Sequence, residues 1–128
     1  MTDERRAELE AEIEAFMARY ENAFVCGTRD DLQALVHLPV IYVSETEAQV
    51  RERYPFDPER MREGIRFHHQ EVEVRIVHLE ETRAHLTIEG TRHRADGSVI
   101  EPIDSFYILH KYNNEWGVSV FSGIRGAR

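Results

Sequence analysis

The chain has 128 residues, 41% of them hydrophobic, which is enough for one core and too few for two, so we expect a single domain over residues 1–128. Its 16 basic against 24 acidic side chains argue against a surface that binds nucleic acid or an anionic membrane. Cys26 is the only cysteine, which excludes an internal disulfide and a thiolate metal cluster. The first residues begin an amphipathic helix rather than a signal peptide, and no apolar run approaches the ~20 residues that span a bilayer. We therefore expect a cytoplasmic protein without a membrane partner.

Helical periodicity dominates the first part of the chain. Apolar side chains recur at the spacing of an amphipathic helix, as Leu9, Ile13, Phe16, Met17, Tyr20 and Phe24. A second helix is expected from a cap at Asp30 or Asp31 as far as Pro39, and residues 40–43 form a short β-rich run. Asp57-Pro58 opens a third helix. On one side of that helix we expect Met61, Ile65, His68 and His69.

From residue 72 onward the periodicity is that of strands. Alternating apolar and polar side chains predict strands within residues 72–76, 83–91, 99–112 and 116–124. Asp96-Gly97 and Asn113-Asn114 mark hairpin turns between them. Three N-terminal helices packed on a curved, mainly antiparallel sheet, here a four-stranded meander, make an α+β domain.

Asp104 is the most informative single residue, because it lies in an otherwise apolar strand and a buried carboxylic acid is costly. One face of this strand carries Asp104, Phe106, Ile108 and His110, and the other carries Ile103, Ser105, Tyr107 and Leu109. The pattern alone does not say which face meets the helices. A strand that is apolar on both sides is covered on both sides, and a second copy of the chain is the expected cover. We therefore predict a homodimer through the outer sheet face.

The order of elements resembles the nuclear-transport-factor-2-like (NTF2-like, SnoaL-like) superfamily of cone-shaped α+β domains. Two segments are similar to the ketosteroid isomerases of that superfamily, namely Arg19-Tyr20 followed by Gly27, and Pro102-Ile103-Asp104-x-Phe106. The resemblance implies a cone-shaped fold over nearly the whole chain. It also implies that Tyr20 and a protonated Asp104 donate hydrogen bonds to a substrate oxygen, as the oxyanion hole of those enzymes does.

The chain departs from the isomerases at the general base. Counted forward from Tyr20, the position of the family's basic aspartate falls on Ser44, which has no useful basicity near neutral pH. A one-residue shift in register would supply Glu45 instead, but such a shift turns the side chain to the other face of a strand. The sequence thus keeps the donors and lacks the base at its expected position.

Each candidate residue also has a structural interpretation. A buried tyrosine usually finds a backbone acceptor, and Asp104 could pair with Arg75 or His110. His68-His69 resembles a fragment of a metal site, but adjacent side chains on a helix diverge by about 100°. The sequence shows neither a His-x-x-x-His pair nor a matching carboxylate, so we expect no metal.

Our hypothesis is a homodimeric cone around a mainly apolar pocket for a small hydrophobic molecule with a carbonyl or phenolic oxygen. Tyr20 and Asp104 would donate the hydrogen bonds, and the apolar lining would consist of Phe16, Tyr42, Met61, Ile65, Leu86, Phe106 and Val118. As an enzyme, the protein would be an isomerase, cyclase or dehydratase that stabilises an enolate without a cofactor. The alternatives are a non-catalytic binding module and a structural small subunit like that of ring-hydroxylating dioxygenases.

Overall fold

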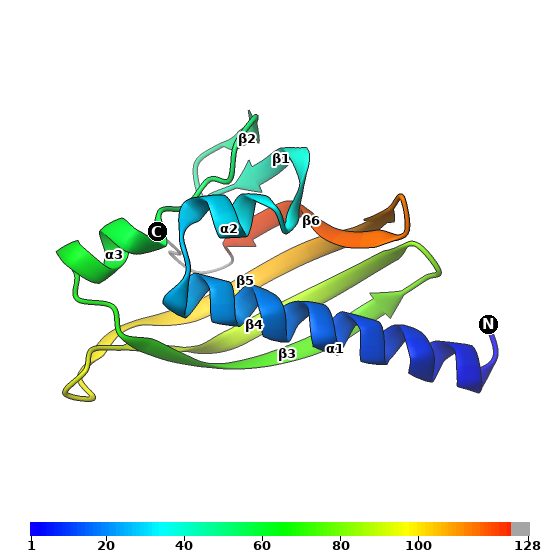
Figure 1. Cartoon of the computed structure of the whole chain (residues 1–128), viewed down its shortest axis with the longest axis horizontal. Helices are drawn as coiled ribbons and strands as arrows, with labels where there is room; N and C mark the ends of the chain where they lie inside the picture. The colour runs from blue at the N-terminus through cyan, green and yellow to red at the C-terminus, as the bar shows by residue number, and fades with distance from the viewer. Residues whose placement is uncertain (124–128) are drawn as a thin grey trace.

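One long helix lies across the concave face of a curved sheet, and this pairing sets the architecture of the chain (Figure 1). The computed structural model describes residues 1–123. Its elements, in chain order, are α1 (Asp3–Cys26), α2 (Arg29–Gln33), β1 (Val36–Val43), β2 (Ala48–Arg51), α3 (Pro58–Gly64), β3 (His69–Leu79), β4 (Arg83–His93), β5 (Val99–Tyr112) and β6 (Glu115–Gly123). Within residues 1–123, no helix combines the length and the apolar character needed to cross a membrane.

The sheet has six strands in the order β2-β1-β6-β5-β4-β3. Strands β3 to β6 pair with their neighbours in antiparallel fashion, which confirms the predicted meander. The β1–β2 hairpin joins the same sheet because β1 runs parallel to β6, so the sheet is mixed and larger than the expected four strands. The expected last residue of the meander, Ile124, lies outside the described residues.

The second helix begins and ends earlier than the sequence predicts. Its cap is Thr28, whose hydroxyl accepts a hydrogen bond from the backbone N–H of Asp31, while the Asp31 carboxylate accepts one from the backbone N–H of Thr28. This reciprocal capping box satisfies two backbone donors at the helix start. The chain then enters β1, so two strands lie between α2 and α3 and the helices do not all precede the sheet.

The third helix is shorter than predicted. It ends at Gly64, and the left-handed backbone of Arg66, at φ 61°, turns the chain out of the helix. His69 is therefore the first residue of β3 and does not share a helix face with Met61.

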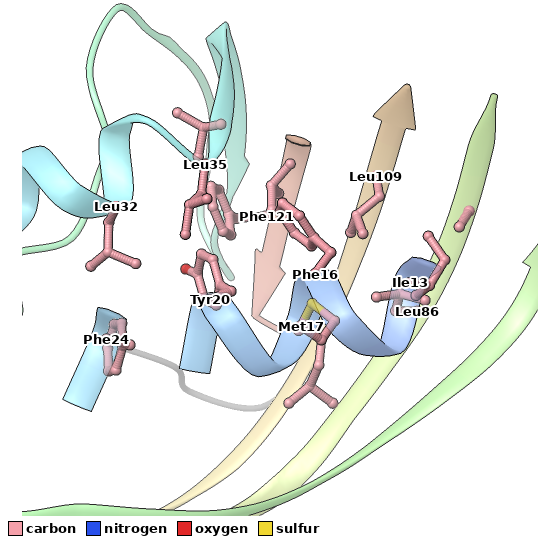
Figure 2. Packing of buried hydrophobic residues seen from close by; sticks show 14 of the residues in the cluster. Ile13, Phe16, Met17, Tyr20, Phe24, Leu32, Leu35, Leu86, Leu109 and Phe121 are labelled. Atoms are coloured by element: carbon pink, nitrogen blue, oxygen red, sulfur yellow. The ribbon is translucent and has the colours of Figure 1, made fainter. Parts of the chain in front are cut away.

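The apolar stripe of α1 forms one half of the core. All six predicted stripe residues are buried: Leu9, Ile13, Phe16, Met17, Tyr20 and Phe24. Figure 2 shows Met17 and Tyr20 on the helix, Phe121 of β6 close to Tyr20, and Leu109 on β5. Complete burial of a large apolar side chain contributes roughly 1.5–3 kcal/mol, so this helix–sheet contact supplies much of the stability.

Strand pairing decides which face of β5 meets α1. Ile103, Ser105 and Leu109 are buried, and the Tyr107 ring contacts Tyr20 of α1. The opposite, outer face of β5 carries Asp104, Phe106, Ile108 and His110.

Gly90 of β4 allows a close approach between β4 and β3. A Cβ atom there would lie 1.8 Å from the carbonyl oxygen of Glu71 and 2.9 Å from the Cα atom of Val72. We expect Gly90→Ala to lower the free energy of unfolding by about 1–3 kcal/mol, because the backbone must shift to relieve the overlap. Urea unfolding followed by circular dichroism measures the change.

The matched control is Gly64→Ala in α3, where an added Cβ meets no atom within 4 Å. Alanine is the better helix former, so this variant should be neutral or more stable by up to about 1 kcal/mol. Equal destabilisation of the two variants would contradict the packing argument.

Candidate functional site

A small, partly open cavity of about 30 Å³ lies inside the cone, between the end of α1, the start of α3 and the inner face of the sheet. Its polar lining comes from Arg92, Ser105, Tyr107 and Ser122. The rest of the lining is mostly aromatic or apolar and comprises Phe24, Tyr42, Phe56, Met61, Phe121 and Gly123. A cavity of this size holds roughly one or two water molecules.

Three tyrosines meet beside this cavity. The hydroxyls of Tyr20, in α1, and Tyr54, in the segment before α3, lie 2.5 Å apart and share a hydrogen bond. The Tyr107 ring packs edge-on against Tyr20 with 5.8 Å between ring centroids. Burial raises the pKa of Tyr107 to about 12, and it raises the pKa of Tyr20 and of Tyr54 well above the usual value for a phenol. All three hydroxyls are therefore neutral hydrogen-bond donors at physiological pH.

Arg92 places a positive charge on the inner face of β4. Its guanidinium carbon lies 5.4 Å from the ring centroid of Phe24 and 6.0 Å from that of Phe67. Its Nη1 atom lies 3.6 Å from the Glu101 carboxylate. The Nε–H group is buried and has no hydrogen-bond partner within residues 1–123. Because a buried donor without a partner costs free energy, this group is suited to an acceptor oxygen of a ligand.

Glu21 follows Tyr20 on α1 and supplies a carboxylate near the cluster. It accepts a hydrogen bond from the Gln70 side-chain amide at 2.5 Å. Burial raises the pKa of Glu21, while that hydrogen bond and the charge of Arg92 oppose the rise. The negative charge of Glu21 also helps to raise the pKa of Tyr107. A carboxylate with a raised pKa is a stronger proton acceptor than an exposed one.

The structure does not bring Asp104 to Tyr20. Asp104 lies on the outer face of β5, opposite Glu89 of β4, while its neighbour Ser105 lies on the inner face and lines the cavity. The predicted donor pair is therefore not assembled. The expectation failed because both faces of β5 are apolar, and an offset of one residue exchanges the two faces.

Phe106 shares the outer face with Asp104. Its ring packs against that of His85, with 5.7 Å between ring centroids, and it does not line the cavity. The same one-residue offset explains why Phe106 is on the wrong side for the pocket that the sequence predicted.

Ser44 and Glu45 lie in the turn between β1 and β2. The Ser44 backbone N–H donates to the carbonyl oxygen of Glu47 at 2.9 Å, and its hydroxyl accepts from the Thr46 N–H at 3.4 Å. Glu45 is exposed, and neither residue lines the cavity. The register shift considered for Glu45 therefore does not bring a base to this cavity.

The predicted apolar lining is divided among three places. Tyr42 and Met61 line the cavity. Ile65 lies on an open depression of about 450 Å³, which also borders on Met61 and Phe56. Three other residues of the predicted lining are buried in the core and do not line the cavity: Phe16, Leu86 and Val118.

Several residues of this site carry no functional prediction from the sequence. Arg92 had a usable signal, because the inward alternation that runs from Ala84 to Gly90 in β4 continues to it. Tyr107 gave no signal, because the sequence pattern did not show which face of β5 meets the helices. Tyr54 lies in an irregular segment without periodicity, and Glu21 shares the charged face of α1, so no pattern distinguishes either of them.

The hydrogen bond between Tyr20 and Tyr54 can be measured by a double-mutant cycle. Tyr20→Phe and Tyr54→Phe should each lower the free energy of unfolding by about 1–3 kcal/mol, because each leaves a buried hydroxyl without its partner. The double variant should cost less than the sum of the two, since it removes both hydroxyls together. Urea unfolding gives the four values, with Tyr112→Phe, at a side chain 61% exposed, as a neutral control. Strictly additive effects would show that the two hydroxyls are not coupled.

Solved structures share this fold. An NTF-2 like protein of unknown function from Shewanella oneidensis has a TM-score of 0.65 at 10% identity, covering 88% of this chain and 96% of that one. A protein from Novosphingobium aromaticivorans, provisionally named a scytalone dehydratase, has a TM-score of 0.62 at 16% identity. The match covers 95% of this chain and 86% of that one. A domain from Exiguobacterium sibiricum, provisionally named a Ca/calmodulin-dependent kinase II association domain, has a TM-score of 0.60 at 13% identity. The match covers 89% of this chain and 90% of that one. At these identities the likeness shows the fold alone.

A comparison with curated proteins finds no match. A family model described as NTF2-like protein (DUF6841) matches residues 10–124, a span that takes in most of α1 and all six strands. The match confirms the resemblance to the NTF2-like superfamily that the sequence suggested. The chain therefore belongs to the NTF2-like family DUF6841.

Proposed function

We propose that the cone binds a small, mainly apolar molecule through a carbonyl or phenolic oxygen. The observation that carries this proposal is the buried Nε–H of Arg92, which has no partner within residues 1–123, together with the cavity that Arg92 and Tyr107 both line. Two residues that carry hydrogen-bond donors, in a lining that is mostly aromatic or apolar, suit an acceptor oxygen on an apolar body.

Tyr20 does not line the cavity but packs against residues that do. Its ring packs against Tyr107 and Phe121, both of which line the cavity, and its hydroxyl is engaged by Tyr54. Tyr107 thus takes the donor role that the sequence assigned to Asp104, and Tyr20 acts through Tyr107 by fixing its position.

Room for the ligand comes from the depression next to the cavity. Phe56 and Met61 line both spaces. A methionine side chain rotates about three bonds and fills irregular gaps, so a shift of Met61 with Phe56 joins the cavity to the depression. The joined space falls in the range of about 300–1,000 Å³ that is typical of small-molecule sites.

Turnover is the second candidate function, and Glu21 favours it. Glu21 lies on a separate open depression between α1 and β3 and does not line the cavity. A shift of its carboxylate toward the tyrosines would place a proton acceptor beside neutral phenol donors, which is what an isomerase, cyclase or dehydratase needs to form an enolate without a cofactor. The likeness to the Novosphingobium protein, whose name is that of a dehydratase, is in keeping with this candidate.

Titration with 2-naphthol, followed by its fluorescence, tests the proposed pocket. Arg92→Met should weaken binding by roughly 10- to 100-fold, because a hydrogen bond to a charged donor is worth about 1.5–3 kcal/mol. Tyr107→Phe should weaken it by roughly 2- to 10-fold, as expected for a neutral donor. Unchanged affinity in the Arg92→Met/Tyr107→Phe double variant would rule out this oxygen site.

Asp104→Asn is the matched control, because Asp104 lies on the opposite face of the sheet and its variant should bind 2-naphthol as the wild type does. Glu21→Gln separates binding from turnover: it should keep the affinity and abolish any activity on a ketosteroid or a hydroxylated aromatic substrate. Activity that survives this change would assign the base to another group.

A homodimer through the outer sheet face completes the proposal. A row of apolar side chains crosses this face, one from each of the neighbouring strands β2, β1, β6 and β5. Its members are Val50, Ile41, Val120 and Ile108. Val50 is 66% exposed and Ile41 is 42% exposed, which favours cover by a second copy of the chain.

Sedimentation equilibrium at micromolar concentration tests the dimer. We expect twice the chain mass of 15.0 kDa for the wild type and the single-chain mass for Ile108→Lys, because a charge in the middle of the apolar row opposes its burial. A wild type that sediments as a monomer would refute the dimer.

A further inference from the structure

Pairing of β3 with β4 brings together two histidines that are a full hairpin apart in the sequence. His69 and His93 are direct partners in the register of the two strands. Their rings stack, with 5.0 Å between centroids and 13° between planes. This pair lies on the outer face of the sheet, on the side away from α1 and from the cavity of Arg92.

Glu71 supplies a carboxylate to the same place, because it lies two residues after His69 and so on the same face of β3. Its Oε1 atom is 3.9 Å from the Nε2 atom of His93. One ligating atom from each of the three residues lies within 4.8 Å of the other two. The sequence predicts no metal site at His68-His69, because it places both residues on a helix. In the structure His69 begins β3, so Glu71 of the same strand and His93 of β4 join it.

The ring of His93 is held in the orientation that a metal ligand needs. Its Nδ1 atom is 3.2 Å from the carbonyl oxygen of Gly97, in the turn between β4 and β5. A carbonyl oxygen only accepts, so Nδ1 carries the proton and Nε2 keeps its lone pair. That Nε2 atom is buried and has no hydrogen-bond partner within residues 1–123. Histidines that bind metals characteristically donate their second N–H to a backbone carbonyl or carboxylate in this way.

His69 is also held by a neighbour. Its Nδ1 atom lies 2.9 Å from the Nδ1 atom of His68, so one of the two rings donates to the other. This contact limits the rotation of the His69 ring, which stays stacked against His93.

From this geometry we propose that His69, Glu71 and His93 bind one divalent transition-metal ion of the zinc type. Two imidazole nitrogens and one carboxylate oxygen are ligands that Zn²⁺ accepts, and three protein ligands leave the fourth position for water. Zinc bonds of about 2.0–2.1 Å in a tetrahedron set the ligand atoms about 3.3 Å apart. The three atoms must therefore approach one another by up to about 1.5 Å. The Glu71 side chain, which is 80% exposed, is free to move toward the two rings.

Charge on the outer face favours a cation at this position. Glu73 of β3 lies opposite Glu89 of β4, and Glu89 lies opposite Asp104 of β5, which forms a row of carboxylates next to the three ligands. The chain as a whole carries a formal net charge of −8 at pH 7. A divalent ion bound by the three ligands would lie beside this row, which also has Arg75 on the same face of β3.

Isothermal titration calorimetry with Zn²⁺ on the full chain, freed of any polyhistidine tag and of metal by EDTA and dialysis, tests the site. We expect one ion per chain. His69→Gln/His93→Gln should lower the affinity at least about 100-fold, and Glu71→Gln should lower it about 10-fold. His110→Gln, at the far end of β5 on the same face, is the matched control and should bind as the wild type does.

Thermal unfolding gives a second measurement. Zn²⁺ should raise the midpoint of the wild type and of His110→Gln and leave that of His69→Gln/His93→Gln unchanged, since only an ion that binds the folded state stabilises it. Equal midpoints of all proteins in EDTA show that the variants fold. No binding by the wild type, or equal affinity in His69→Gln/His93→Gln, would overturn the proposal. Neither result bears on the pocket inside the cone, because the metal site uses none of its residues.

Discussion

The hydrogen bond between Tyr20 and Tyr54 is the contact on which the wall of the cavity depends. Tyr54 is fully buried although it belongs to no helix or strand. Its backbone carbonyl accepts two hydrogen bonds from the Arg29 guanidinium, and its backbone N–H donates to the Gln33 side chain. One residue thus ties the irregular segment before α3 to α1 through its hydroxyl and to α2 through its backbone. Phe56, two residues later, is held against the cavity as a consequence.

Helix α1 and the meander could be predicted because their side chains repeat with the period of the element. The six buried residues of α1 follow its helical period, and β4 alternates between buried and more accessible side chains. Which face of β5 meets the core could not be predicted, because both faces of this strand carry apolar side chains. Only its register against β4 shows that Tyr107 is inside and Asp104 is outside. The resemblance to the superfamily therefore predicted the fold, whereas the donor pair of Tyr20 and Asp104 that it implied is not assembled.

Features that arise from tertiary contacts had no local signal. Tyr54 reaches the core from an irregular segment, and its burial depends on contacts with α1 and α2. His69 and His93 become neighbours only through the exact number of residues in a hairpin. A shift of one residue in that pairing would point one of the two rings into the core. Such groupings follow from register, and register follows from the whole pattern of burial on both strands.

Arg92 and His93 are consecutive residues of β4, and the alternation of a strand sends their side chains to opposite faces. Arg92 lines the internal cavity, and His93 stacks with His69 on the outside. A single peptide unit therefore forms part of both surfaces. A molecule that shifted this peptide on binding Arg92 would also shift the imidazole of His93. Any coupling that results must be reciprocal, so the occupant of one face and the occupant of the other would change each other's affinity by the same factor.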